Sequence, residues 1–207
     1  MDKRKIRDSL RLAGAMFFSW LYIPHLLVFM AIGGGKKNLI ISDLEQLEYQ
    51  VGIMGLPKWL LLLDLLHNNR YYRVIFYHRI GAALSMLMEW YRPGDRYFTI
   101  GKTVKIGKGM WIAHPYATVL AADSIGDNFK CIHCTTLGNT SAGRPTIGNN
   151  VQLGANVTVV GPVHIGNNVI VGAGAVVVKD IPDNSVAFGN PCKVARENKD
   201  GMIFKKR

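Results

Sequence analysis

Two histidines in the middle of the chain are the residues best suited to proton transfer. His114 lies in the stretch IAHPY and His133 in CIHCT, 19 residues further on. An imidazole ring accepts a proton near neutral pH, so either residue could act as a general base. Cys131 and Cys134 flank His133, but the chain has no second CxxC pair to complete a zinc site. The sequence therefore predicts histidine chemistry, no metal site, and a packing role for both cysteines.

A six-residue repeat reveals the elements that must position these histidines. An aliphatic residue, commonly followed by Gly or Ala, recurs every six places in three phases that begin at Ile100, Ile125 and Ile147. This period predicts a parallel β-helix in which three hexads complete one triangular coil. We expect each aliphatic side chain to point inward and each small residue to let the chain turn a corner.

The first phase shift predicts how the two histidines stack. It adds one residue between the first two phases, which makes Cys131 the expected coil equivalent of Ile112. His133 should then lie one coil above His114, roughly 4.8 Å away, the spacing of neighbouring strands. The prediction is a pair of histidines on one face of the β-helix.

The second phase shift is larger and predicts a loop. Four extra residues fall within GNTSAGRPT (138–146), a stretch that includes Arg144. Above the histidines, the same column continues through Ala155 and Ala173. These small residues predict a slot that admits a slender acyl-pantetheine arm.

The first 98 residues predict a helical region. Residues 39–50 predict a helix opened by a capping box of Ser42 and Glu45, and residues 57–68 and 69–91 follow with mostly helical spacing of apolar residues. We expect three segments: a helical region at 1–98, the β-helix at 99–191 and a C-terminal tail at 192–207.

An uncharged run at residues 12–33 is long enough to cross a bilayer, and Lys and Arg residues lie on both sides of it. Pro24 and His25 in its middle argue against an undisturbed spanning helix. Two interpretations stay open. The run forms buried helices that cover a neighbouring subunit, or it lies on the inner face of the cytoplasmic membrane with its basic flanks on anionic lipid.

Composition limits the partners. The chain of 207 residues has a formal net charge of +11, but no dense Lys/Arg block with interleaved aromatic residues, which argues against nucleic-acid binding. Phosphate-bearing cofactors and anionic membrane surfaces account for the charge at least as well. Three cysteines form no disulfide framework, so we expect a reducing compartment and a cytoplasmic protein.

Residues 99–196 resemble the hexapeptide-repeat acyltransferases, specifically their serine acetyltransferase-like branch, and the resemblance extends to RYYRVIFYHRIG at 70–81. It rests on the stretches AHPYATV (113–119), TTLG (135–138), IGNNVQLGANVTVVG (147–161) and VVVKDIPDNSVAFGNPCKVAR (176–196). The resemblance implies a left-handed β-helix, a homotrimer and acetyl-CoA as co-substrate. Whether trimers pair into a dimer of trimers stays open.

The resemblance also implies roles for individual residues. His114 falls where the family's catalytic base stands, and His133 could orient it or contact the acceptor. Arg144 falls in the loop that supplies a basic pair for the carboxylate of serine. The positions along the acetyl-CoA groove are Gly154, Ala155, Gly172, Ala173 and Lys179.

Two departures from the family pattern bear on the acceptor. Ala113 stands where the serine enzymes carry an aspartate directly before the base, and Thr99 stands where they carry a carboxylate fifteen places before it. The loop is also about four residues shorter and lacks one member of the basic pair. We therefore expect O-acetyl transfer to a sugar hydroxyl in capsule or surface-polysaccharide synthesis, with serine as the alternative acceptor.

Two functions of other classes stay as alternatives. A γ-type carbonic anhydrase takes zinc on three histidines, but His164 occupies a different part of the hexad from His114 and His133. A non-catalytic scaffold would explain the repeat, but neither the loop nor the column of alanines.

Overall fold

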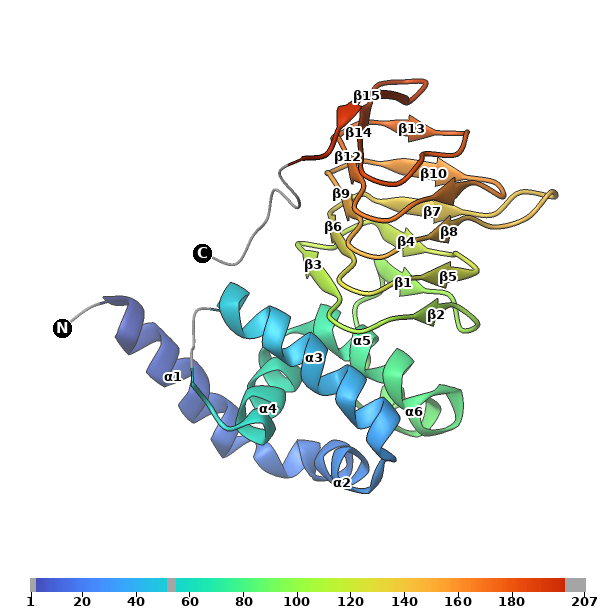
Figure 1. Ribbon diagram of the computed structural model, residues 1–207. Helices are drawn as coiled ribbons and strands as arrows, with labels where there is room; N and C mark the ends of the chain where they lie inside the picture. The colour runs from blue at the N-terminus through green and yellow to red at the C-terminus, as the bar shows by residue number, and fades with distance from the viewer. Residues whose placement is uncertain (1–2, 52–54, 200–207) are drawn as a thin grey trace. The chain divides into compact units, whose positions relative to one another are not determined.

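The computed structural model describes residues 3–51 and 55–199. The chain divides into two compact units, Met1–Asp95 and Arg96–Arg207, the first helical and the second a β-helix (Figure 1). The helices are α1 (Lys3–Phe17), the 3-10 helix η1 (Ser19–Tyr22), α2 (Ile23–Ala31), α3 (Gly34–Val51), α4 (Lys58–Asn68), α5 (Arg70–Ile80) and α6 (Ala82–Glu89).

Two details of the predicted helices are wrong. The capping box does not form, because α3 begins at Gly34 and Ser42 lies inside the helix, where its hydroxyl donates to the carbonyl of Leu39 at 2.8 Å. Burial of an apolar face outweighs the local capping signal. The helix expected over 69–91 is divided at Gly81, whose φ of 96° belongs to the left-handed region and separates α5 from α6.

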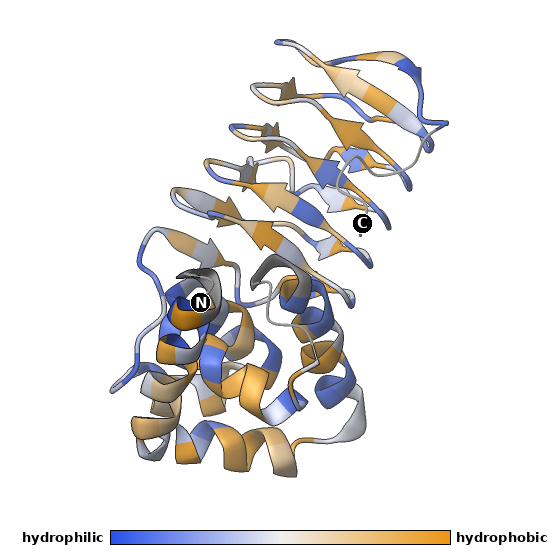
Figure 2. Ribbon diagram, turned by 90° about the vertical axis from the view of Figure 1, so that its left-hand side faces the viewer, coloured by the Kyte–Doolittle hydropathy of each residue, from blue (hydrophilic) through white to orange (hydrophobic). Residues whose placement is uncertain are grey.

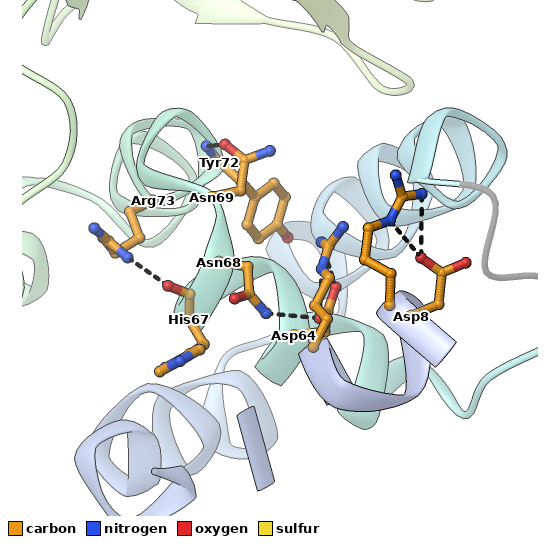
Figure 3. A network of polar contacts seen from close by, with 9 residues as sticks. Asp8, Asp64, His67, Asn68, Asn69, Tyr72 and Arg73 are labelled. Atoms are coloured by element: carbon orange, nitrogen blue, oxygen red, sulfur yellow. Dashed lines mark hydrogen bonds and ion pairs between the residues drawn. The ribbon is translucent and has the colours of Figure 1, made fainter. Parts of the chain in front are cut away.

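Buried ion pairs fasten the helices to one another. Arg11 of α1 donates two hydrogen bonds, of 2.9 and 2.6 Å, to the carboxylate of Asp64 in α4, which also accepts from Asn68 (Figure 3). Arg79 of α5 pairs with Asp43 of α3 at 2.8 and 3.1 Å, and both side chains are buried. A buried carboxylate needs such a partner, so these pairs fix which helices pack together.

The uncharged run at 12–33 is not one helix. It is broken between α1 and α2, and Pro24 lies in the first turn of α2, a position where proline is tolerated. No single described helix is long and apolar enough to cross a membrane. The pair Ile6–Phe17 and Ser19–Ala31 meets the length and composition requirement together, with a bend of 67°.

The second unit confirms the predicted parallel β-helix. One sheet joins β1, β4, β7, β10 and β13, a second joins β2, β5, β8 and β11, and a third joins β3, β6, β9, β12 and β14. The strands are β1 (Phe98–Ile100), β2 (Lys105–Ile106), β3 (Trp111–Ala113), β4 (Thr118–Leu120), β5 (Ser124–Ile125), β6 (Lys130–Ile132), β7 (Thr136–Gly138), β8 (Thr146–Ile147), β9 (Gln152–Leu153), β10 (Thr158–Val160), β11 (His164–Ile165), β12 (Ile170–Val171), β13 (Val176–Val177), β14 (Ser185–Phe188) and β15 (Lys193–Glu197).

The last strand lies within the segment expected to be a tail. β15 pairs antiparallel with β14 and adds a sixth strand to the third sheet. Residues 200–207 of the expected tail lie outside the described residues.

The repeat packs as its pattern predicts. Ile112 pairs with Cys131, Cys131 with Leu153 and Leu153 with Val171, and all four side chains are buried. The small residues that follow are required by close stacking: a Cβ added at Gly126 would lie 2.6 Å from the carbonyl oxygen of Gly148. Figure 2 shows hydrophobic residues recurring on the strands and hydrophilic residues at many of the turns.

One corner of the β-helix is held by stacked asparagines that the sequence pattern did not reveal to us. Asn128, Asn150, Asn168 and Asn184 all have φ between 54° and 57°. Each amide of the first three donates to the side-chain oxygen of the next at 2.9 to 3.0 Å. Asparagine tolerates the left-handed region, so the ladder satisfies side chains while the chain turns. The recurring Asp-Asn and Asn-Asn pairs are the signal for it.

A buried histidine ties α2 to the end of the helical unit. Nε2 of His25 lies 3.0 Å from the hydroxyl of Tyr77, which donates its own hydrogen to the carbonyl of Arg92. His25 is fully buried. Burial, followed by the nearby charges of Arg73 and Arg92, lowers the pKa of His25 to about 4.

We predict that the helical unit loses stability as pH falls from about 6.5 to about 4. The unfolded chain binds a proton at His25 below about pH 6.5, whereas the folded chain resists it until about pH 4. The two pKa values set a limit of about 3 kcal/mol for this loss. In His25→Gln the thermal midpoint, followed by the helical circular dichroism signal, should depend less steeply on pH. Some slope should remain, because burial also lowers the pKa of His67. An unchanged slope in His25→Gln would contradict the prediction.

Candidate active site

The turn between β3 and β4 carries an insertion. Ile112 pairs with Cys131, 19 residues later, whereas Leu120 pairs with Leu137, 17 residues later. The turn at 114–117 therefore contains two residues more than the turn above it. The next corner, between Leu120 and Ile125, is one residue shorter than the usual six-residue step. The predicted pairing of Ile112 with Cys131 is confirmed, but the single extra residue is the net result of two opposite changes.

His114 opens this enlarged turn in a constrained conformation. Its φ is 50° and that of Ala117 is 51°, both in the left-handed region that non-glycine residues seldom adopt. The backbone N–H of Tyr116 donates to the carbonyl of His114 at 2.6 Å, and the N–H of Cys134 donates to the carbonyl of Tyr116 at 2.8 Å. The His114 side chain is exposed. Strained backbone at an exposed histidine is the kind of feature that gathers at functional sites.

The column that contains His133, Ala155 and Ala173 differs from the prediction in its first residue. The N–H of Asn156 donates to the carbonyl of His133 at 3.0 Å, and that of Gly174 to the carbonyl of Ala155 at 2.9 Å. His133, Ala155 and Ala173 therefore occupy successive coils, as predicted. By the register of β4, however, the residue beneath His133 is Tyr116, because the insertion displaces His114 from the column. Among residues 3–51 and 55–199, no hydrogen bond joins the rings of His114 and His133.

The residues expected along the acetyl-CoA groove divide into two groups. Ala173 is exposed and Ala155 half-buried, both on the corner that His133 occupies. Gly154 and Gly172 leave no room for a side chain. A Cβ added at Gly154 would lie 2.6 Å from the backbone nitrogen of Ala173, and a Cβ added at Gly172 would lie 2.9 Å from Cβ of Phe188. Lys179 is exposed and follows β13. It therefore lies at the C-terminal ends of the strands of the first sheet, whereas the corner of His133 lies at their N-terminal ends.

The extruded loop occupies residues 139–145, between β7 and β8. Thr140 and Gly143 bridge its arms, and Arg144 donates from Nη1 to the hydroxyl of Thr103 at 2.9 Å. His114 precedes the strands of the first sheet and Arg144 follows them. The length of a three-residue strand, about 10 Å, therefore separates these two positions within one chain. A single chain does not bring Arg144 to His114.

The two positions where the resemblance implies carboxylates hold none. Ala113 is buried at the end of β3, and Thr99 is an exposed residue of β1 that pairs with Val119. His164 lies in the second sheet, where its Nδ1 is 2.9 Å from the hydroxyl of Thr146. In the part of the chain that the structure describes, no three His, Cys, Asp or Glu side chains are grouped to hold a metal ion.

An aromatic pair beside His114 escaped the sequence analysis. The rings of Tyr97 and Tyr116 are 5.3 Å apart between centroids and inclined by 47°. Their side chains are 61% and 54% exposed, so neither belongs to the core. No motif marks this pair, because the two residues meet only once the insertion lifts Tyr116 into its place in the turn.

Comparison with known sequences shows that the chain is similar to proteins named acetyltransferases. The family described as bacterial transferase hexapeptide (six repeats) matches residues 144–179. The putative colanic acid biosynthesis acetyltransferase WcaB of Escherichia coli (strain K12) is 42% identical over 101 residues, which are 47% of this chain and 62% of WcaB. The serine acetyltransferase of Helicobacter pylori (strain ATCC 700392 / 26695) is 34% identical over 143 residues, which are 67% of this chain and 78% of that protein.

Solved structures share the fold. The serine acetyltransferase of Neisseria gonorrhoeae superposes with a TM-score of 0.66 at 23% identity and covers 83% of this chain and 70% of its own. The soybean serine acetyltransferase complexed with serine gives 0.63 at 25%, over 77% of this chain and 69% of its own. These likenesses confirm the fold predicted from the repeat. With the extent of the Helicobacter pylori match, they show that the chain belongs to the hexapeptide-repeat acyltransferases, in the branch that includes the serine acetyltransferases.

Proposed function

We propose that the protein is an acetyl-CoA-dependent O-acetyltransferase in which His114 is the general base. The observation that carries the proposal is the enlarged turn, which presents this one histidine outside the stacked column with its backbone fixed by φ and by hydrogen bonds. Relatives named acetyltransferases support the reaction class. A serine acetyltransferase of the same fold from Brucella abortus was solved in complex with coenzyme A, in agreement with acetyl-CoA as the donor.

The proposed reaction needs one proton carrier. A ring nitrogen of His114 takes the proton from an acceptor hydroxyl while that oxygen attacks the thioester carbon. The tetrahedral oxyanion then collapses, the C–S bond breaks, and the thiolate of CoA receives the proton from the imidazolium. Because the hydroxyl attacks directly, no acetyl group is carried by the protein, and Cys134 beside His133 takes no part as a nucleophile.

A sugar hydroxyl is the acceptor that we propose. Recognition of serine requires a negative partner for its ammonium, and Ala113 stands where the serine enzymes carry an aspartate directly before the base. Thr99 stands where they carry the carboxylate that orients the base. The guanidinium of Arg144, which would meet a carboxylate, is engaged with Thr103. WcaB, a relative named as a putative acetyltransferase of colanic acid biosynthesis, supports the same class.

Serine is the second candidate. It is favoured by the match to the Helicobacter pylori serine acetyltransferase, which spans more of this chain than the match to WcaB. The soybean enzyme that shares this fold was solved with serine bound.

A homotrimer would complete the site, and we include it in the proposal. His114 lies at the N-terminal ends of the strands of the first sheet and Arg144 at their C-terminal ends, so the two residues of one chain cannot contact the same acceptor. In a threefold assembly, the corner that carries His114 can face the corner that carries Arg144 of a neighbouring copy.

We also propose that the helical unit binds the inner surface of an anionic membrane. Exposed apolar residues follow one another at intervals of mostly three or four along α1, η1 and α2, with exposures between 37% and 76%: Ile6, Leu10, Phe17, Trp20, Ile23, Leu27 and Met30. Lys3, Arg4, Lys5 and Arg7 precede or accompany them in α1, whereas Arg11 is paired with Asp64. An apolar stripe with aromatic residues and basic neighbours is typical of helices that lie in the membrane interface.

This surface suits lipid better than a second copy of the chain. A symmetric contact would bring the basic segments of two α1 helices together, and like charges repel. Anionic lipid provides the complementary charge. The cytoplasmic side is the location that we propose, because three cysteines in the chain offer no disulfide framework.

For the reaction, we predict that His114→Ala lowers acceptor-dependent release of CoA from acetyl-CoA by about 10² to 10⁴-fold, the usual range for loss of a general base. His133→Ala should retain more of the rate than His114→Ala, because its ring makes no hydrogen bond to that of the base. The measurement compares pyranoside acceptors with L-serine in a thiol assay. If His114→Ala keeps the wild-type rate, the assignment of the base is wrong. If CoA is released with serine but with no pyranoside, serine is the acceptor and the proposed sugar acceptor is wrong.

For the membrane, we predict that the full chain sediments with vesicles of phosphatidylcholine and phosphatidylglycerol, more weakly as salt rises, because exposed charges are screened. The variant Phe17→Ser/Trp20→Ser should stay in the supernatant. The matched control Leu87→Ser/Trp90→Ser removes two large exposed apolar side chains, one from α6 and one from the residue that follows it, and should still sediment. Equal sedimentation of both variants, or none by the unchanged chain, would refute the surface. Concentration-dependent self-association lost in Phe17→Ser/Trp20→Ser would assign the stripe to a second copy.

A further inference from the structure

We infer that Tyr97 and Tyr116 form a stacking platform for the sugar ring of the acceptor, next to the proposed base. The inference rests on the proposed function and names the part of the acceptor that is recognised. Its basis is an aromatic pair that lies on the surface, 61% and 54% exposed, of which Tyr116 belongs to the turn of His114.

The backbone of the pair is held in place by the fold. The carbonyl of Tyr116 accepts from the N–H of Cys134 at 2.8 Å and from the hydroxyl of Thr118 at 3.3 Å, while its own N–H donates to His114. The carbonyl of Tyr97 accepts from the N–H of Thr118 at 3.0 Å. Thr118, the first residue of β4, thus donates hydrogen bonds to the backbone carbonyls of both tyrosines. A binding surface with a fixed backbone loses little entropy when a ligand is bound.

Tyr116 lies close to the proposed base along the chain. A single residue, Pro115, separates His114 from Tyr116, and the hydrogen bond of 2.6 Å closes a tight turn across it. An acceptor ring that rests on Tyr116 is therefore held near the imidazole. Holding the reacting hydroxyl beside its base is a large part of what an enzyme contributes to such a reaction.

The chemistry of the two rings favours a pyranose. The face of a tyrosine ring is negative, and the axial C–H groups of a pyranose form an apolar, weakly positive face of similar size. The two rings are inclined by 47° to one another, and both side chains are more than half exposed. Serine has only one CH₂ group to offer such a surface. Its ammonium could meet a ring face, but at an exposed site that contact is weak.

The test uses saturation-transfer NMR on the full chain with methyl β-D-glucopyranoside and methyl β-D-galactopyranoside as probes, and L-serine for comparison. We expect saturation at the axial protons of at least one pyranoside. It should be lost in Tyr97→Ala/Tyr116→Ala and kept in Tyr97→Phe/Tyr116→Phe, which preserves both rings. Trp59→Ala removes an exposed aromatic side chain of the helical unit and is the matched control that should change nothing.

Kinetics separate the platform from the reaction itself. With a pyranoside that accepts acetyl, each tyrosine-to-alanine change should raise KM by about tenfold, with kcat changed by much less. Saturation that persists in Tyr97→Ala/Tyr116→Ala, or saturation of L-serine alone, would overturn the platform. If the pyranoside signal depends on both tyrosines but no acceptor releases CoA, the platform stands and the proposed acetyl transfer fails.

Discussion

The hydrogen bonds between successive coils are the constraint on which the rest of the β-helix depends. Each strand from β1 to β14 pairs in parallel with its equivalent one coil away, so the register of every sheet is tied to the others. A residue added within a strand would turn every later side chain to the wrong face. Extra residues must therefore leave the coil at a corner. This chain uses two corners for that purpose, at 114–117 and at 139–145, and both carry the side chains that we assign to function.

The first of these insertions is small and rigid. Its two additional residues are accommodated by placing His114 in the left-handed region, whereas Ala117 shares its positive φ with Cys134 and Asn156 at the same corner of later coils. A backbone hydrogen bond from Cys134 to Tyr116 joins the turn to the coil above. The same change moves His114 out of the stacked column and puts Tyr116 into it. Base and aromatic platform are thus products of one alteration of the backbone. A histidine held in this way needs little reorganisation when an acceptor arrives, which agrees with a role in proton transfer.

The fold was predictable because a six-residue period directly reports the inward-facing columns, and pairings such as Ile112 with Cys131 follow from it. The turn of His114 was only partly predictable, since the sequence shows a net shift of one residue and conceals an insertion of two followed by a deletion of one. Ser42 misled us because packing of α3 outweighs its capping signal. The separation of Arg144 from His114 was not predicted from the sequence, because it depends on which ends of the strands the two residues occupy.

The most direct test of this account is to delete Pro115 and Tyr116, which shortens the turn to the length of the one that holds His133 and Cys134. The thermal midpoint and the dissociation constant for acetyl-CoA should change little, since the coil register already has room for the shorter turn. Release of CoA with a pyranoside acceptor should fall by about 100-fold or more, because the base loses its position. A deletion variant that keeps the wild-type rate, or one that cannot fold, would contradict the claim that this insertion builds the active site.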